Sequence, residues 1–241
     1  MESKEKALNG VGEATAKLRA ELGESLASVQ KFDKPLQQVT TSSFEALKAY
    51  TQGKRMFDRE GDTEAIPFFK QAVKLDSGFA IAYAYLGISY VNLGEIAQGL
   101  EPLRKAFEAR EHSSERENYF IEACYYSIVT GELDKADQGL QLWISEYPRD
   151  DNYPHLLLAV NYGKMGRMEE AISETREHLK VDPDSAIAYD NLAQYYLYTG
   201  RLDDAKSTLD AAYSLQSGRF PKSPDRISDR FFSQRPSRYA G

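Results

Sequence analysis

The sequence has 241 residues, of which 41% are apolar and 28% charged, a composition typical of a globular protein with a sizeable core. Its formal net charge is -7; residues 219–241 contribute +4, from six Arg or Lys and two Asp, which leaves -11 on the remainder. An acidic body excludes general nucleic-acid binding, because phosphates require a basic face. The longest nearly apolar stretch, residues 79–91, is too short to cross a bilayer, so we expect no membrane insertion by this chain.

Residues 1–42 are predicted to form an amphipathic helix followed by a linker. Seven residues recur at alternating spacings of three and four, which is the period of one helix face, although two of them are polar. Pro35 and the Thr and Ser residues after it indicate a linker or the entry to the next helix, with Ser42 or Ser43 as its N-cap. The first residues lack the apolar core of a secretory signal, so none is expected. The seven positions are Leu8, Val11, Thr15, Leu18, Leu22, Ser25 and Val29.

Four glycines mark a repeated pattern through the rest of the chain. Gly94, Gly131, Gly166 and Gly200 are separated by 37, 35 and 34 residues, and the last two begin the similar phrases GRMEEA and GRLDDA. A small residue precedes each of these glycines by seven positions, and Gly or Ala follows each by five. These two columns of small residues are Gly87, Cys124, Ala159 and Ala193, and Gly99, Ala136, Ala171 and Ala205.

This spacing predicts antiparallel helix pairs. The glycine ends a first helix because it accepts a positive φ at little cost, and the acids after it suit the start of a second helix. Small residues let the two helices approach, and Pro148 and Pro183 end two of the units. A fifth, weaker unit begins near Ser43, with its turn displaced by one residue because Gly61 follows Gly53 by eight positions. We therefore predict five helix pairs over residues 43–218.

The columns resemble the tetratricopeptide repeat, whose 34-residue unit has the same order of Leu-Gly, Tyr, Gly, Ala, Phe, Ala and Pro. The resemblance covers residues 43–216, which is most of the chain. It implies an all-α fold, a right-handed superhelical solenoid of antiparallel helix pairs. It also implies that a protein or peptide binds along the concave surface formed by the first helices of the pairs.

Several positions depart from the repeat pattern. Trp143 and His178 stand where a small residue is expected, and three extra residues separate the second and third units. We expect the stack to be irregular there, with Trp143 filling space in the core. Cys124 lies in a column of small packing residues, so we expect a buried thiol and not a nucleophile.

The sequence shows no motif for catalysis or for cofactor binding. The three His residues are scattered, the one Cys cannot form a zinc site with a second thiol, and no phosphate-binding loop or protein-kinase motif occurs. We expect no enzymatic activity, no metal and no cofactor. An accessory catalytic site among the many carboxylates is the open alternative.

Candidate ligand-binding residues lie on the faces of the first helices opposite the packing columns. Many of them are aromatic or apolar, and a large exposed strip of this kind marks a contact surface. Some family members grip a C-terminal carboxylate with Lys, Asn and Arg on these faces; that clamp is absent here, where the equivalent positions are Lys54, Ile88, Tyr125, Val160 and Gln194. Phe57, Glu122, Lys164 and Asp190 are further candidate residues of the predicted groove. Its residues are Tyr50, Lys54, Tyr85, Ile88, Asn92, Asn118, Ile121, Tyr125, Leu157, Asn191, Gln194 and Tyr198.

Residues 17–53 resemble the segment that leads into the repeats of large bacterial serine/threonine protein kinases and related signalling proteins, of the kind common in acidobacteria. This resemblance implies a sensor or scaffold region, and it leaves open that the chain is the extracytoplasmic part of a membrane-anchored protein. The basic, Pro-containing residues 219–241 are expected to be flexible. The alternative to ligand binding is self-assembly, in which the helix that carries Leu18 and Leu22 pairs two chains into a homodimer.

Overall fold

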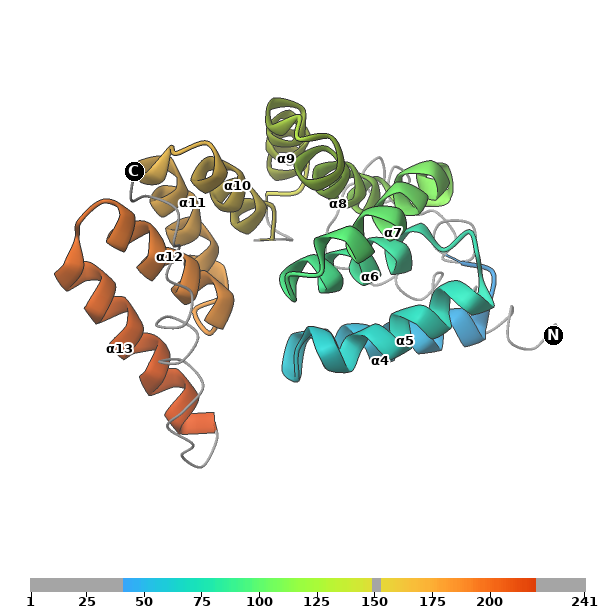
Figure 1. The fold of residues 1–241 in the computed structure, drawn as a ribbon, viewed down its shortest axis with the longest axis horizontal. Helices are drawn as coiled ribbons and strands as arrows, with labels where there is room; N and C mark the ends of the chain where they lie inside the picture. Colours follow the sequence, from blue (N-terminus) through green and yellow to red (C-terminus); the bar gives the residue numbers. More distant parts are fainter. Residues whose placement is uncertain (1–40, 149–152, 220–241) are drawn as a thin grey trace, which may run out of the picture. The chain divides into compact units, whose positions relative to one another are not determined.

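The computed structural model describes residues 41–148 and 153–219, and within them every regular element is a helix (Figure 1). Helices joined by a short turn run in opposite directions, as α4 and α5 show. The predicted all-α fold of antiparallel helix pairs is confirmed. The helices are α4 (Phe44–Arg59), α5 (Asp62–Leu75), α6 (Ala80–Asn92), α7 (Ile96–Ala109), α8 (Glu115–Cys124), α9 (Leu133–Glu146), α10 (Tyr153–Lys164), α11 (Met168–Val181), α12 (Ala186–Tyr198) and α13 (Leu202–Arg219).

The chain divides into two compact units, one that ends at Leu157 and one that starts at Leu158, so the boundary falls within α10. In the first unit α4 packs on α5, α5 on α6, α6 on α7 and α8 on α9; in the second, α11 packs on α12 and α12 on α13. The sequence did not predict this division. The predicted N-terminal helix lies outside the described residues, and so does the tail beyond residue 219.

Three of the turn glycines close their first helices in the same way. Gly94, Gly166 and Gly200 have φ of +80°, +75° and +73°, a region that side chains of L-residues rarely adopt. After Gly200, the N–H of Arg201 donates to the carbonyl of Tyr196 at 2.8 Å, and the same bond across five residues follows Gly94 and Gly166. This is the Schellman motif, so the predicted role of these glycines is confirmed.

Small residues allow the two helices of a pair to approach closely. A Cβ atom added to Gly87 would lie 2.6 Å from Cγ of Leu103 and 2.9 Å from the carbonyl oxygen of Gly99, so α6 and α7 meet backbone to backbone. In the last pair, Ala193 and Ala205 occupy the corresponding columns and are fully buried. The predicted packing columns are therefore the core of the helix pairs.

The first helix pair begins and turns as the sequence predicts. The Oγ of Ser43 accepts a hydrogen bond from the N–H of Ala46 at 3.1 Å, so Ser43 is the N-cap of α4. Gly61 has a φ of +112°, and α5 starts at the next residue, Asp62. After Gly94 the second helix starts two residues later, at Ile96, and this difference accounts for the displaced turn.

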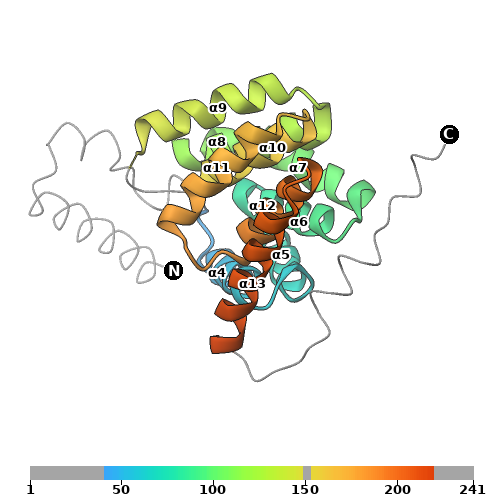
Figure 2. The same ribbon diagram turned by 90° about the vertical axis from the view of Figure 1, so that its left-hand side faces the viewer.

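The junction between α7 and α8 absorbs the three extra residues. A short 3-10 helix, Arg110–His112, follows α7, and Ser114 then caps α8 in a capping box with Glu117. The N–H of Ser114 donates to Oε2 of Glu117 at 2.8 Å, and the N–H of Glu117 donates to Oγ of Ser114 at 3.2 Å. Helix α8 continues into a π-helix, Tyr125–Thr130, and ends at Gly131, while α9 lies beside α8 (Figure 2). The expected irregularity is present at this junction.

Candidate functional site

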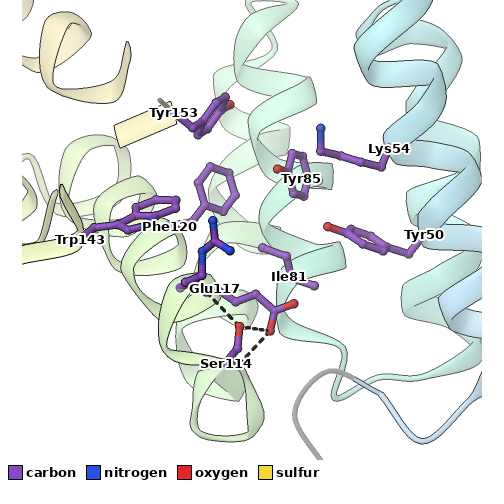
Figure 3. Close-up of a pocket in the computed structure, with 10 residues that line it drawn as sticks. Tyr50, Lys54, Ile81, Tyr85, Ser114, Glu117, Phe120, Trp143 and Tyr153 are labelled. Carbon is purple, nitrogen blue, oxygen red and sulfur yellow. Dashed lines mark hydrogen bonds between the residues drawn. The ribbon is translucent and has the colours of Figure 1, made fainter. Parts of the chain in front are cut away.

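A cavity of about 410 Å³ opens in the first unit, within the size range of ligand pockets. Figure 3 shows Tyr50 and Lys54 entering from α4 on one side, Phe120 and Trp143 from α8 and α9 on the other, and Tyr85 between them. Five of the ten lining residues are aromatic. The lining residues are Tyr50, Lys54, Ile81, Tyr85, Ser114, Arg116, Glu117, Phe120, Trp143 and Tyr153.

Helical spacing places these side chains on common faces. Tyr50 and Lys54 are four residues apart on α4, and Ile81 and Tyr85 are four apart on α6, so each pair projects from one face of its helix. On α8, Phe120 follows Glu117 by three residues and therefore shares its face. Seven of the ten lining residues lie on α4, α6 and α8, the first helices of the first three pairs, whose face the repeat pattern assigns to ligand binding, and Ser114, Trp143 and Tyr153 complete the lining.

Aromatic rings in contact form the cavity wall. The ring centroids of Tyr50 and Tyr85 are 5.9 Å apart, and those of Tyr85 and Phe120 are 5.0 Å apart in a stacked arrangement. The series continues to Tyr153, whose ring centroid is 5.6 Å from that of Phe120. Each such contact contributes about 0.5–1.5 kcal/mol beyond the burial of apolar area. The wall is therefore fixed before any ligand arrives.

The polar groups of the cavity are mostly hydrogen-bond donors. Burial raises the pKa of Tyr50 and of Tyr85 well above the ordinary tyrosine value, and the neighbouring carboxylates of Glu117 and Asp58 raise that of Tyr50 further. Both hydroxyls therefore stay protonated, and neither makes a hydrogen bond to another described residue. Nζ of Lys54 lies 2.5 Å from Oδ1 of Asp58 and 5.2 Å from the ring centroid of Tyr85.

Trp143 has two roles in the structure. Its side chain is 4% exposed, so the prediction that it fills space in the core is confirmed, and its ring lies 6.3 Å from that of Tyr119 at an interplanar angle of 17°. The same residue lines the cavity. Its Nε1 is buried and has no hydrogen-bond acceptor among the described residues. A buried donor without an acceptor destabilises a protein by about 1–3 kcal/mol.

The structure places the predicted groove residues of the first unit in three kinds of environment. Tyr50, Lys54 and Tyr85 line the cavity. Ile88 and Ile121 are buried, with Ile121 only 1% exposed, and they do not line the cavity. The others lie elsewhere: Asn92 is exposed and donates to Asp62, Asn118 is half-buried with its Oδ1 unpaired, Tyr125 stacks on Phe107 with 3.9 Å between ring centroids, and Leu157 is half-buried.

In the second unit the predicted groove residues share one face of α12. Asn191, Gln194 and Tyr198 follow one another at spacings of three and four residues, and Tyr198 is 66% exposed. Ile187, which the sequence analysis did not select, lies one turn before Asn191 and is also exposed. This face carries apolar and amide side chains. A role of these residues in ligand binding stays a prediction.

Seven cavity residues were not selected from the sequence. On α8, which a π-helix separates from Gly131, Phe120 lines the cavity where Ile121 was expected. Trp143 could have been found, because it was already marked as too large for its column. The seven residues are Ile81, Ser114, Arg116, Glu117, Phe120, Trp143 and Tyr153.

The described residues contain neither a metal-binding group of side chains nor a membrane-spanning helix. Across residues 41–148 and 153–219, no group of three or more His, Cys, Asp or Glu side chains is placed to hold a metal ion. Over the same part of the chain, no helix combines the length and the apolar character that a membrane span requires. Cys124 is buried, as its column predicted.

Comparisons with known proteins identify the repeat. The family model of the tetratricopeptide repeat matches residues 186–218, which contain α12 and nearly all of α13. Among curated proteins, none matches this sequence. The solved structure of TTC0263, described as a thermophilic TPR protein in Thermus thermophilus, is 19% identical with a TM-score of 0.53, and the match covers 78% of this chain and 96% of that one.

Two other solved structures are similar over comparable lengths. One is MamA, from residue 41 to its end, of Desulfovibrio magneticus RS-1, with 17% identity, a TM-score of 0.43 and coverage of 74% of this chain and 99% of that one. The other is YrrB, described as a TPR protein with an unusual peptide-binding site, with 21% identity, a TM-score of 0.41 and coverage of 79% and 92%. At these identities the similarity to TTC0263 shows the fold alone. The chain thus has the fold of a tetratricopeptide-repeat protein, and its last helix pair carries the sequence pattern of that repeat.

Proposed function

We propose that this chain is a protein-interaction module that binds a peptide segment of a partner protein in the cavity of its first unit. The observation that carries the proposal is the preformed aromatic wall of Tyr50, Tyr85 and Phe120, which first helices of three successive pairs build together. An apolar cavity with a few directed polar groups is the default form of a binding site. A binding role also agrees with the helical-repeat fold, which presents first helices along one surface.

Physical chemistry favours binding over catalysis at this site. The side chains that line the cavity are rings and donors, and its one carboxylate, Glu117, is engaged in the capping box of α8. General acid–base catalysis needs a group poised to take up or release a proton near the working pH. Tyr50 and Tyr85 are held protonated by burial instead, so they can donate hydrogen bonds but not exchange protons under ordinary conditions.

Peptide selection on the wild-type chain, followed by affinity measurements on cavity variants, tests this function. A library of short random peptides is selected against the wild-type chain, and the affinities of the enriched peptides are then measured for Tyr50→Ala and for Lys54→Glu. We expect both variants to weaken binding at least about tenfold, the effect of losing a central contact. The matched control is Tyr198→Ala, which removes an exposed ring from the second unit and should leave affinity unchanged. If the control weakens binding while both cavity variants bind normally, the site is on α12 and the proposal fails.

The wider role that we propose is that of a sensor or scaffold region in a bacterial signalling protein. It is supported by the resemblance of residues 17–53 to segments that precede such regions. The gene neighbourhood tests it: a kinase or DNA-binding module encoded in the same reading frame supports the role. A reading frame that joins these repeats to a metabolic enzyme would contradict it.

A further inference from the structure

We propose that the cavity selects a peptide segment in which an acidic side chain stands beside an aromatic one. This inference deepens the proposed function and rests on it. In this proposal the carboxylate of the peptide binds to the hydrogen-bond donors and cations of the cavity, and the aromatic ring of the peptide packs on the wall formed by Tyr85 and Phe120.

The hydrogen-bond donors of the cavity exceed its acceptors. The Nε1–H of Trp143 is buried without an acceptor among the described residues, and the hydroxyls of Tyr50 and Tyr85 make no hydrogen bond there either. The carboxylate of Glu117 already accepts from both the N–H and the hydroxyl of Ser114. A ligand group that complements this set must therefore accept hydrogen bonds. A purely apolar ligand would leave the hydroxyls of Tyr50 and Tyr85 without an acceptor.

The side chains that line the cavity carry more positive than negative charge. Lys54 and Arg116 line it together with one carboxylate, that of Glu117, and Asp58, which pairs with Lys54, is not a lining residue. A ligand cation would meet both basic side chains, and the face of Tyr85 already has a cation, because Nζ of Lys54 lies 5.2 Å from its ring centroid. A carboxylate meets the same two cations favourably and forms charge-assisted hydrogen bonds with neutral donors.

The size and walls of the cavity require more than a carboxyl group. A volume of about 410 Å³ has room for a ring beside the carboxylate. The stacked rings of Tyr85 and Phe120, with Tyr153 next to them, offer faces and edges to such a ring. We assign the carboxylate to an acidic side chain of the peptide, because of the first-unit positions at which related proteins clamp a chain terminus only Lys54 is basic, and Ile88 and Tyr125 do not line the cavity.

The intrinsic fluorescence of Trp143 provides a direct binding signal, because it is the one tryptophan of the sequence and it lines the cavity. The probe is acetyl-Gly-Ser-Phe-Glu-Gly-Ser-amide, whose two ends carry no charge, and its partners have Gln or Lys in place of Glu. We expect the Glu peptide to bind at least about tenfold more tightly than the Gln peptide, and the Lys peptide to bind most weakly. Added salt should reduce the difference. Calorimetry with the same peptides confirms the affinities without relying on fluorescence.

Two variants locate the carboxylate. Lys54→Gln should reduce the preference for Glu over Gln, and the control Lys48→Gln, on the same helix but outside the cavity, should leave it unchanged. Tyr50→Phe removes only a hydroxyl and should weaken the Glu peptide more than the Gln peptide. Because these changes leave the aromatic wall in place, the variants are expected to fold.

The failures of the two proposals are distinguishable. If library peptides bind in the cavity but the Gln or Lys peptide equals the Glu peptide, or none of the three binds, this inference is wrong and the proposed function stands. If acetyl-Gly-Ser-Gly-Phe with a free terminal carboxylate binds as tightly as the Glu peptide, the carboxylate comes from a chain terminus and the assignment to an acidic side chain is overturned. If neither the library nor the probes bind, both proposals fail.

Discussion

The second unit follows the repeat pattern closely, whereas the first unit departs from it where the cavity lies. In the second unit the turns at Gly166 and Gly200 close with the same hydrogen bonds, and the family pattern matches α12 and most of α13. In the first unit a 3-10 helix precedes α8 and a π-helix follows it. Four of the ten cavity residues belong to α8 or to its cap Ser114. With Trp143 of α9, the irregular pair thus contributes five of the ten residues that line the cavity.

Trp143→Ala should give the largest loss of stability among single changes in the irregular pair. Removing this buried ring leaves a void beside the cavity, and we expect a cost of about 3 kcal/mol in free energy of unfolding, measured by urea denaturation. Trp143→Phe keeps most of the volume and removes the unpaired N–H, so it should cost less than about 1.5 kcal/mol. The control Leu142→Ala changes an exposed neighbour and should be close to neutral. If the Phe and Ala variants lose the same free energy of unfolding, removal of the indole N–H is itself costly. That result would mean that the N–H has a hydrogen-bond partner.

Alkaline pH should destabilise the regular second unit through Tyr195. Burial raises the pKa of Tyr195 from about 10 to about 12, and its hydroxyl donates to the carbonyl of Ala159 at 3.1 Å. The unfolded state releases this proton near pH 10 and the folded state near pH 12, so stability present below pH 10 is lost as pH rises to 12. Two pKa units correspond to about 2–3 kcal/mol.

The variant Tyr195→Phe should flatten this alkaline loss, as urea denaturation on either side of pH 10 will show. The control is Tyr213→Phe, which removes the hydroxyl of an exposed tyrosine in the same unit. If Tyr195→Phe loses as much stability as the wild type between pH 10 and 12, another group is responsible for the effect.

Gly87→Ala should destabilise the α6–α7 pair by about 1–3 kcal/mol, because its Cβ would meet both Leu103 and the backbone of Gly99. The matched control is Gly139→Ala on α9, where an added Cβ meets no atom within 4 Å. Alanine stabilises a helix interior relative to glycine, so Gly139→Ala should raise stability by about 0.5–1 kcal/mol. Thermal unfolding of both variants will show the opposite signs. The same sign for both would contradict the close approach of α6 and α7.

Ser114→Ala should give the smallest effect of this set, a loss of about 1 kcal/mol, because it removes half of the capping box that starts α8. Hydrogen exchange should show faster opening at the start of α8 than in α12. Ser113→Ala, one residue earlier, is the control. Equal exchange in the Ser114 and Ser113 variants would show that the cap does not hold this irregular junction in place.

The helix pairs could be predicted from the sequence because their determinants are local. Glycines at a fixed spacing need a positive φ, and small residues seven positions before and five after them need a close neighbour. From these local requirements the sequence predicts that Gly94 ends a helix and that Ala159 and Ala171 are buried, and the structure shows both. The same reasoning identified Tyr50, Lys54 and Tyr85, which lie in the less disturbed part of the first unit.

The rest of the cavity could not be predicted, because a π-helix, Tyr125–Thr130, lies between α8 and Gly131, from which the packing columns were counted. A difference of one residue rotates a helix face by about 100°. The sequence therefore indicated Ile121, whereas the structure places Phe120 at the cavity and buries Ile121. Trp143 and Tyr153 come from two other helices, and only the tertiary packing brings them to the same site.

The most direct test of a binding site in the first unit is hydrogen exchange measured along the chain with and without a bound peptide. The tightest peptide from the library is used at a concentration that saturates the protein. The account predicts added protection in α4 and α8, which carry Tyr50, Lys54 and Phe120, and unchanged exchange in α12. Protection confined to α12, with α4 and α8 unchanged, would contradict it.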